Sequence, residues 1–81
     1  MNRIETLLSF IGQRPDDPFP RYGLALEYKN AGQLEEAQNV FSELIDKFPE
    51  YTAAYLHAGN VLASLGRKDE ARLVYEKGIA V

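Results

Sequence analysis

His57 is the one side chain in this sequence that ordinarily titrates near neutral pH. To act as a general base it needs a partner group within hydrogen-bond reach. The nearest acidic residues in sequence, Glu50 and Asp69, are too far along the predicted helix to orient it. None of the three serines lies in a nucleophile elbow. We therefore predict no enzyme, and two interpretations of His57 stay open: a solvated or capping histidine, or a contact to a partner.

Metal and cofactor sites are also not predicted. The absence of cysteine excludes thiolate ligands, and a single histidine excludes zinc sites built from two or more histidines. The acidic pairs Asp16-Asp17 and Glu35-Glu36 could be ligands, but both lie where helices are predicted to begin, so we interpret them as capping and dipole-complementing residues. Gly12 and Gly32 lie outside any glycine-rich strand-to-helix turn, which argues against a phosphate loop.

The composition limits the possible partners. A chain of 81 residues predicts one domain, 1–81. The net charge of −3 and the pI near 5.0 disfavour binding to nucleic acid, which needs clustered Lys and Arg. No apolar run reaches the roughly 18 residues of a membrane span, and the first residues lack the apolar segment of a signal peptide. We therefore expect a soluble, cytoplasmic protein without nucleic-acid or membrane partners.

The sequence repeats itself with a period of 34 residues. Pro15 recurs as Pro49, and Gly32 recurs as Gly66. Apolar positions recur at the same offset, as the columns Leu7, Phe41, Tyr75 and Ile11, Ile45, Ile79 illustrate. A period of this length fits one pair of helices in each repeat.

Apolar residues spaced by three and four predict five helices, at about 2–14, 18–31, 34–47, 52–65 and 68–80. Gly32 and Gly66 are expected to end helices in the left-handed conformation, and Asp17 to cap the second helix. Glu43 and Lys47 are spaced for an ion pair along the third helix. No sustained alternation supports strands. The expected fold is all-α, and its short connections make neighbouring helices antiparallel.

The sequence resembles the tetratricopeptide repeat family over essentially its whole length. The matching positions are Leu24, Ala25, Tyr28, Gly32, Ala37, Phe41 and Pro49 in the unit 18–51, and Tyr55, Ala58, Gly59, Leu62, Gly66, Ala71 and Tyr75 in the unit 52–81. Residues 2–17 resemble the second helix of a preceding unit. The resemblance implies helix-turn-helix repeats stacked as a right-handed α-solenoid.

Small residues are expected where paired helices approach closely. Three departures from the family pattern stand out. Arg21 replaces the usual bulky first residue, and Leu44 and Gly78 replace the usual second alanine. Gly78, near the end of the chain, suggests a frayed last turn. The expected close pairs are Ala25 with Ala37 and Gly59 with Ala71.

The resemblance also implies a noncatalytic module that binds a protein or peptide on the concave side of the solenoid. The family positions on that side correspond to Phe19, Tyr22, Leu26, Lys29, Leu56, His57 and Asn60, together with Gly23, Ala53 and Ala63. Some family members grip a C-terminal carboxylate there with Lys and Asn, but only Asn60 matches such an Asn, so this clamp is disfavoured. Alternatively, Tyr22, Leu26 and Leu56 pack against neighbouring helices.

Two rival functions remain open: a homo-oligomerising structural module, and a fragment of a larger scaffold. Self-association has a physical motive, because solenoids usually end in a helix with a polar outer face, and neither terminal helix here is predicted to have one. The residues expected to associate are Val74, Tyr75 and Ile79 in the last helix, and Ile4, Leu8 and Ile11 in the first.

Overall fold

The computed structural model describes residues 2–81, so residue 1 of the expected domain lies outside the described residues. It confirms the all-α prediction: residues 2–81 contain helices and turns and no strand. The helix bounds differ from those expected by at most one residue. The helices are α1 (Arg3–Gln13), α2 (Pro18–Asn30), α3 (Leu34–Lys47), α4 (Thr52–Ser64) and α5 (Lys68–Ala80).

The predicted start of α2 and the predicted turns after α2 and α4 are present. The Asp17 carboxylate accepts the Phe19 N–H at 3.0 Å, which caps α2. Gly32 and Gly66 have φ of 78° and 79°, a conformation that glycine adopts without the Cβ clash of other residues. Each glycine N–H and the following N–H bond back to the last turn of the preceding helix, so both turns are Schellman motifs.

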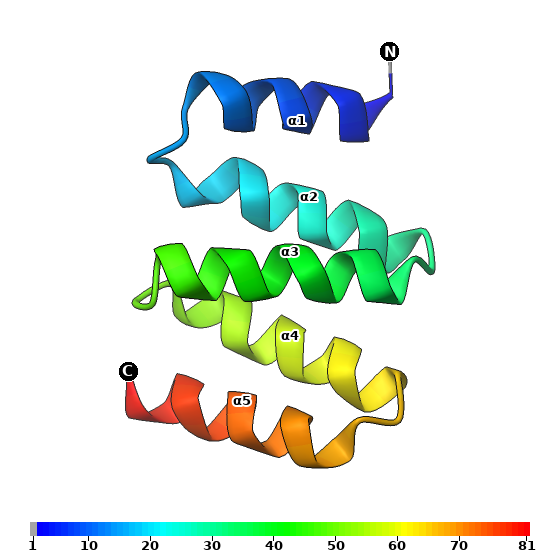
Figure 1. Cartoon of the computed structure of the whole chain (residues 1–81), viewed down its shortest axis with the longest axis vertical. Coiled ribbons are helices and arrows are strands. Elements are labelled where there is room, and N and C mark those ends of the chain that lie inside the picture. The colour runs from blue at the N-terminus through cyan, green and yellow to red at the C-terminus, as the bar shows by residue number, and fades with distance from the viewer. Residues whose placement is uncertain (1) are drawn as a thin grey trace.

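The helices form a single antiparallel stack in which each packs against its neighbours in sequence, from α1 at one end to α5 at the other (Figure 1). The stack measures 36 × 26 × 13 Å. Its core lies in the middle, where Phe41, Leu44, Val61 and Leu62 are the largest fully buried side chains. By contrast, α1 has no fully buried residue and α5 has only Ala71.

Arg21 departs from the family pattern, yet it forms a hydrogen bond equivalent to that of Tyr55, the residue at the same position of the next repeat. The Arg21 guanidinium donates to the carbonyl of Pro15 at 2.9 Å, and the Tyr55 hydroxyl donates to the carbonyl of Pro49 at 2.6 Å. Both side chains are buried, and both hold the preceding loop against the helix that follows it. Arg21 also pairs with Glu43 at 2.9 Å, whereas no ion pair joins Glu43 to Lys47 in the described chain, so that expected pair was wrong.

Two expectations about glycine need correction. The nearest neighbour of Gly59 is the ring of Tyr75 rather than Ala71: a Cβ at Gly59 would lie 2.3 Å from Tyr75 Cε1. Gly78 does not mark a frayed turn, because α5 continues to Ala80. A Cβ at Gly78 would lie 2.6 Å from Tyr55 Cβ, so this glycine lets α5 pack closely on α4.

Candidate functional site

The helix α4 is the one described helix without Asp, Glu, Lys or Arg. A charge-free helix normally lies inside a protein, yet Leu56 on α4 is 57% exposed. We call the part of the molecule around it the α2/α4 surface, defined by the seven residues expected to face a partner. These are Phe19, Tyr22, Leu26, Lys29, Leu56, His57 and Asn60.

Aromatic rings form the centre of the α2/α4 surface. The ring of Tyr22 lies edge-on to His57, with centroids 5.6 Å apart, and 5.3 Å from the ring of Tyr51. His57 is also nearly parallel to the buried ring of Phe41, at 6.2 Å and 6°. His57 is therefore half-buried beside Tyr22 and Phe41, and its position in the middle of α4 shows that it does not cap the helix.

His57 faces a cation. Lys29 Nζ lies 3.4 Å from His57 Nδ1, and because an ammonium can only donate, a hydrogen bond between them requires the neutral imidazole with Nδ1 as the acceptor. Burial, with a further contribution from the Lys29 ammonium, lowers the pKa of His57 below its usual 6.5. The lowered pKa favours the neutral ring between α2 and α4, with Nδ1 directed at the lysine ammonium.

Tyr51 is a member of this aromatic group that the sequence analysis missed. It precedes α4, in the loop between repeats, and no helical periodicity extends to it. Burial raises the pKa of the Tyr51 hydroxyl above its usual 10.0, and the nearby Tyr22 and Asp17 raise it further. Its neutral ring extends the uncharged part of the α2/α4 surface past the start of α4.

The remaining predicted residues do not join this group. Phe19 is exposed and lines a separate hollow between α1 and α2, and Leu26 is half-buried against the core. Asn60 accepts a hydrogen bond from the Tyr75 hydroxyl on α5. Leu56 lines a pocket between α4 and α5. A hydrogen bond and an aromatic contact thus bring Tyr22, Lys29 and His57 together.

The residues expected to mediate self-association differ in how exposed their side chains are. Val74 packs on the core, and Tyr75 lies against Gly59, so both are half-buried. Ile79 is 85% exposed. It lies at the rim of a pocket of about 360 Å³ between α4 and α5, lined by Thr52, Tyr55, Leu56, Tyr75, Gly78 and Ile79.

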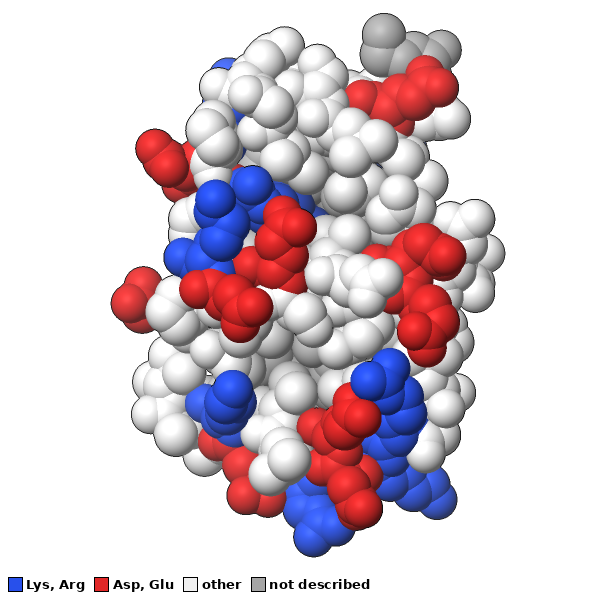
Figure 2. Space-filling view, viewed as in Figure 1, with Lys and Arg blue, Asp and Glu red and all other residues white. Residues whose placement is uncertain are grey.

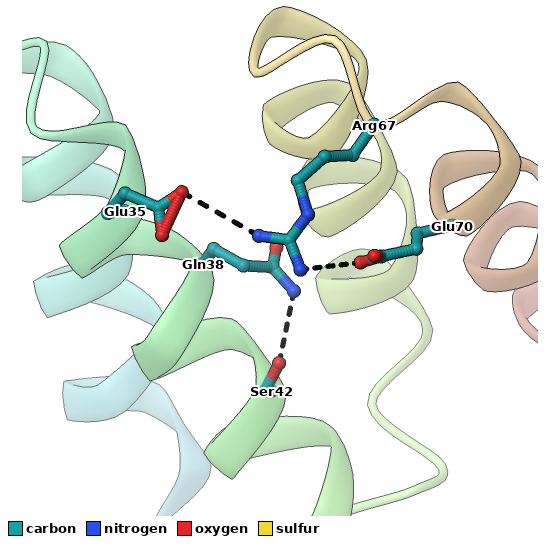
Figure 3. Close-up of polar contacts among 5 residues, drawn as sticks. All are labelled: Glu35, Gln38, Ser42, Arg67 and Glu70. Atoms are coloured by element: carbon teal, nitrogen blue, oxygen red, sulfur yellow. Dashed lines mark hydrogen bonds and ion pairs between the residues drawn. The ribbon is translucent and has the colours of Figure 1, made fainter.

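The face on which α3 lies in front of α4 has a different character. Figure 2 shows acidic and basic side chains interspersed over it, as expected for a solvated surface. Figure 3 shows Arg67 between two carboxylates, at 3.6 Å from Glu35 and 2.6 Å from Glu70, so that it ties α3 to α5. Beside it, Gln38 donates to Ser42, and its buried carbonyl oxygen has no hydrogen-bond partner among the described residues.

Residues 2–81 offer neither a metal site nor a membrane-spanning helix. No group of three His, Cys, Asp or Glu side chains lies close enough to hold a metal ion. None of the described helices is both long and apolar enough to cross a membrane.

Comparison with known proteins identifies the repeat. The family model described as Tetratricopeptide repeat matches residues 22–80. A TPR repeat-containing protein of Pseudomonas aeruginosa is 29% identical over 95% of this chain and 73% of its own length. An uncharacterized protein of Methanocaldococcus jannaschii is 35% identical over 74% of this chain and 70% of its own length.

Solved structures agree with this similarity. The crystal structure of a tetratricopeptide repeat domain protein from Salinibacter ruber is 38% identical, with a TM-score of 0.75 over 79% of this chain and 72% of that chain. A solution NMR structure of a tetratricopeptide repeat domain protein from the same organism is also 38% identical, with a TM-score of 0.77 over 82% of this chain and 67% of that chain.

Proposed function

Since the chain belongs to the tetratricopeptide repeat family, whose members are generally noncatalytic protein-interaction modules, we propose that it binds a protein or peptide segment on the α2/α4 surface. The cytoplasmic location expected from the sequence stays a prediction.

The observation that carries this proposal is the combination of exposure and absent charge on α4. A solvated helix face normally carries charged residues, as α3 and α5 do. On α4 the exposed positions are Thr52, Ala53, Leu56, Ala63 and Ser64. Burying Leu56 under a partner removes apolar area from water without desolvating any charge of α4, which favours binding.

The test compares two leucines of similar exposure on different faces. Leu56 on α4 is 57% exposed, and Leu73 on α5 is 63% exposed. The chain is used to capture partners from a lysate of its source organism, as wild type, Leu56→Glu and Leu73→Glu. We expect the wild type and Leu73→Glu to recover the same proteins, and Leu56→Glu to lose them, because glutamate would have to be desolvated at the interface.

The Leu73→Glu variant also defines the result that would contradict binding on the α2/α4 surface. If Leu73→Glu loses the partners and Leu56→Glu keeps them, the partner binds beside α5 and the α2/α4 proposal fails. Urea melts of both variants check that each is folded, since surface substitutions usually change stability by about 0.5 kcal/mol or less.

Homo-oligomerisation is the second candidate function, and the exposure of Ile79 at the rim of an apolar pocket favours it. Leu8 and Phe10 on α1 are exposed at the opposite end of the stack. Exposed apolar side chains at the ends of a stack are what association of copies would bury.

A further inference from the structure

Lys29 is an unusual cation in this molecule. Of the Lys and Arg residues, Arg21 is buried, Lys29 is half-buried and the others are exposed. Arg21 has the Glu43 carboxylate and the Pro15 carbonyl as partners. No ion pair within residues 2–81 includes Lys29, and its side-chain hydrogen bond goes to the His57 imidazole.

Lys29 as a residue is half-buried, and a cation in such a position is stabilised best by an opposite charge. The groups that face His57 do not supply one. Lys29 and Tyr22 approach it from α2, the uncharged Phe41 approaches it from α3, and Tyr51 lies behind Tyr22. Asp17 lies near Tyr51, but it forms no ion pair with Lys29, so the positive charge of Lys29 is unpaired within residues 2–81.

We propose that Lys29 and His57 together bind the side-chain carboxylate of a glutamate or aspartate within an otherwise apolar partner segment. This inference rests on the proposed function and names the chemistry that the α2/α4 surface selects. An oxygen of the carboxylate accepts from Lys29 Nζ, which has N–H groups beyond the one directed at His57.

The position of the pair favours a side chain over a chain terminus. Exposed, uncharged residues of α4 lie both before His57, at Ala53 and Leu56, and after it, at Ala63 and Ser64. A partner that ended in a carboxylate at His57 would leave one of these stretches uncovered. An acidic residue in the middle of a segment lets the segment cover both.

Binding of a carboxylate has a measurable consequence for His57. A negative charge beside the ring favours the imidazolium, which donates from both nitrogens. The bound state therefore takes up a proton as the pH falls below neutral, and affinity for an acidic segment rises. An uncharged segment brings no negative charge to the ring and so does not raise the pKa of His57, and its affinity does not rise as the pH falls.

The single histidine makes this testable by NMR, because its ring resonances need no assignment. The probes are three pools of nonapeptides with capped ends, in which an apolar residue (Leu, Ala, Ile or Phe) alternates with serine. The pools differ only in the central residue, which is Glu, Gln or Lys. We expect the Glu pool to bind at least roughly fivefold more tightly than the Gln pool and to move the His57 titration midpoint to higher pH. Replacing Lys29 with methionine should remove both effects, while Lys68→Met, at an exposed lysine, should keep them.

The remaining outcomes separate the two proposals. If the Glu and Gln pools move the Leu56 resonances and bind with equal affinity, the carboxylate inference is wrong and the proposed function still stands. If no pool moves the Leu56 resonances, the proposed function fails and this inference fails with it. A fourth pool has central Gln and a free C-terminal carboxylate. If it matches the Glu pool, the ligand is a chain terminus and the side-chain assignment is wrong.

Discussion

At the residue scale, Gly59 and Gly12 are helical glycines in different surroundings, so replacing each with alanine should change the stability in opposite directions. Gly59→Ala would place a Cβ 2.3 Å from the ring of Tyr75, whose hydroxyl is held by Asn60. We expect it to lower the free energy of unfolding by about 1–2 kcal/mol, because overpacking outweighs the better helix propensity of alanine. Gly12 has no neighbour within 4 Å. Gly12→Ala should therefore stabilise by up to about 1 kcal/mol. Urea melts measure both, and equal stabilisation would contradict the close contact at Gly59.

His57 gives the stability of the protein a predictable pH dependence. Its pKa is lowered by folding, so the unfolded chain binds more protons below the usual value of 6.5. The stability linked to His57 is therefore complete above 6.5 and is lost as the pH falls towards the folded-state pKa. We expect the wild type to lose stability relative to His57→Gln across this window. The measured quantity is the difference in free energy of unfolding between the wild type and His57→Gln. If this difference does not change with pH, or if it shifts in favour of the wild type as the pH falls, the burial assigned to His57 is contradicted.

At the element scale, Arg21 and Tyr55 each fasten a loop to the helix that follows it. Arg21→Met removes the bond to Pro15 and the ion pair with Glu43, and we expect it to cost about 1–3 kcal/mol. Glu43→Gln weakens only the ion pair with a largely exposed carboxylate, so it should cost about 1 kcal/mol or less. Urea melts followed by circular dichroism compare the two. If Glu43→Gln costs as much as Arg21→Met, the loop bond contributes nothing.

At the scale of the whole molecule, the exposed end of the stack predicts association at high concentration. Ile79, at 85% exposure, can be replaced without disturbing the core, unlike Val74 or Tyr75. We expect the apparent molecular mass of the wild type in light scattering to rise with concentration. Ile79→Lys should stay at the monomer mass of 9.1 kDa, and Leu73→Lys should behave as the wild type. A wild-type chain that remains monomeric at millimolar concentration would refute association through this end.

The sequence by itself determined the helices, their turns and the family. Those features depend on signals that act over a few residues: apolar spacing, the left-handed conformation of Gly32 and Gly66, and the cap at Asp17. Because the signals recur every 34 residues, they also predicted the stacking order that the structure confirms. The one local pairing that failed, Glu43 with Lys47, failed because a buried arginine on another helix is the stronger partner.

Only the tertiary structure decided which side chains meet. Lys29 and His57 are 28 residues apart, Arg21 and Glu43 are 22 apart, and Tyr75 and Asn60 are 15 apart. Whether such groups touch depends on how helices cross and how closely they approach, and ångström-scale differences in that packing leave no periodic trace in the sequence. For the same reason, the sequence could not reveal that a lysine and two aromatic rings lie beside His57.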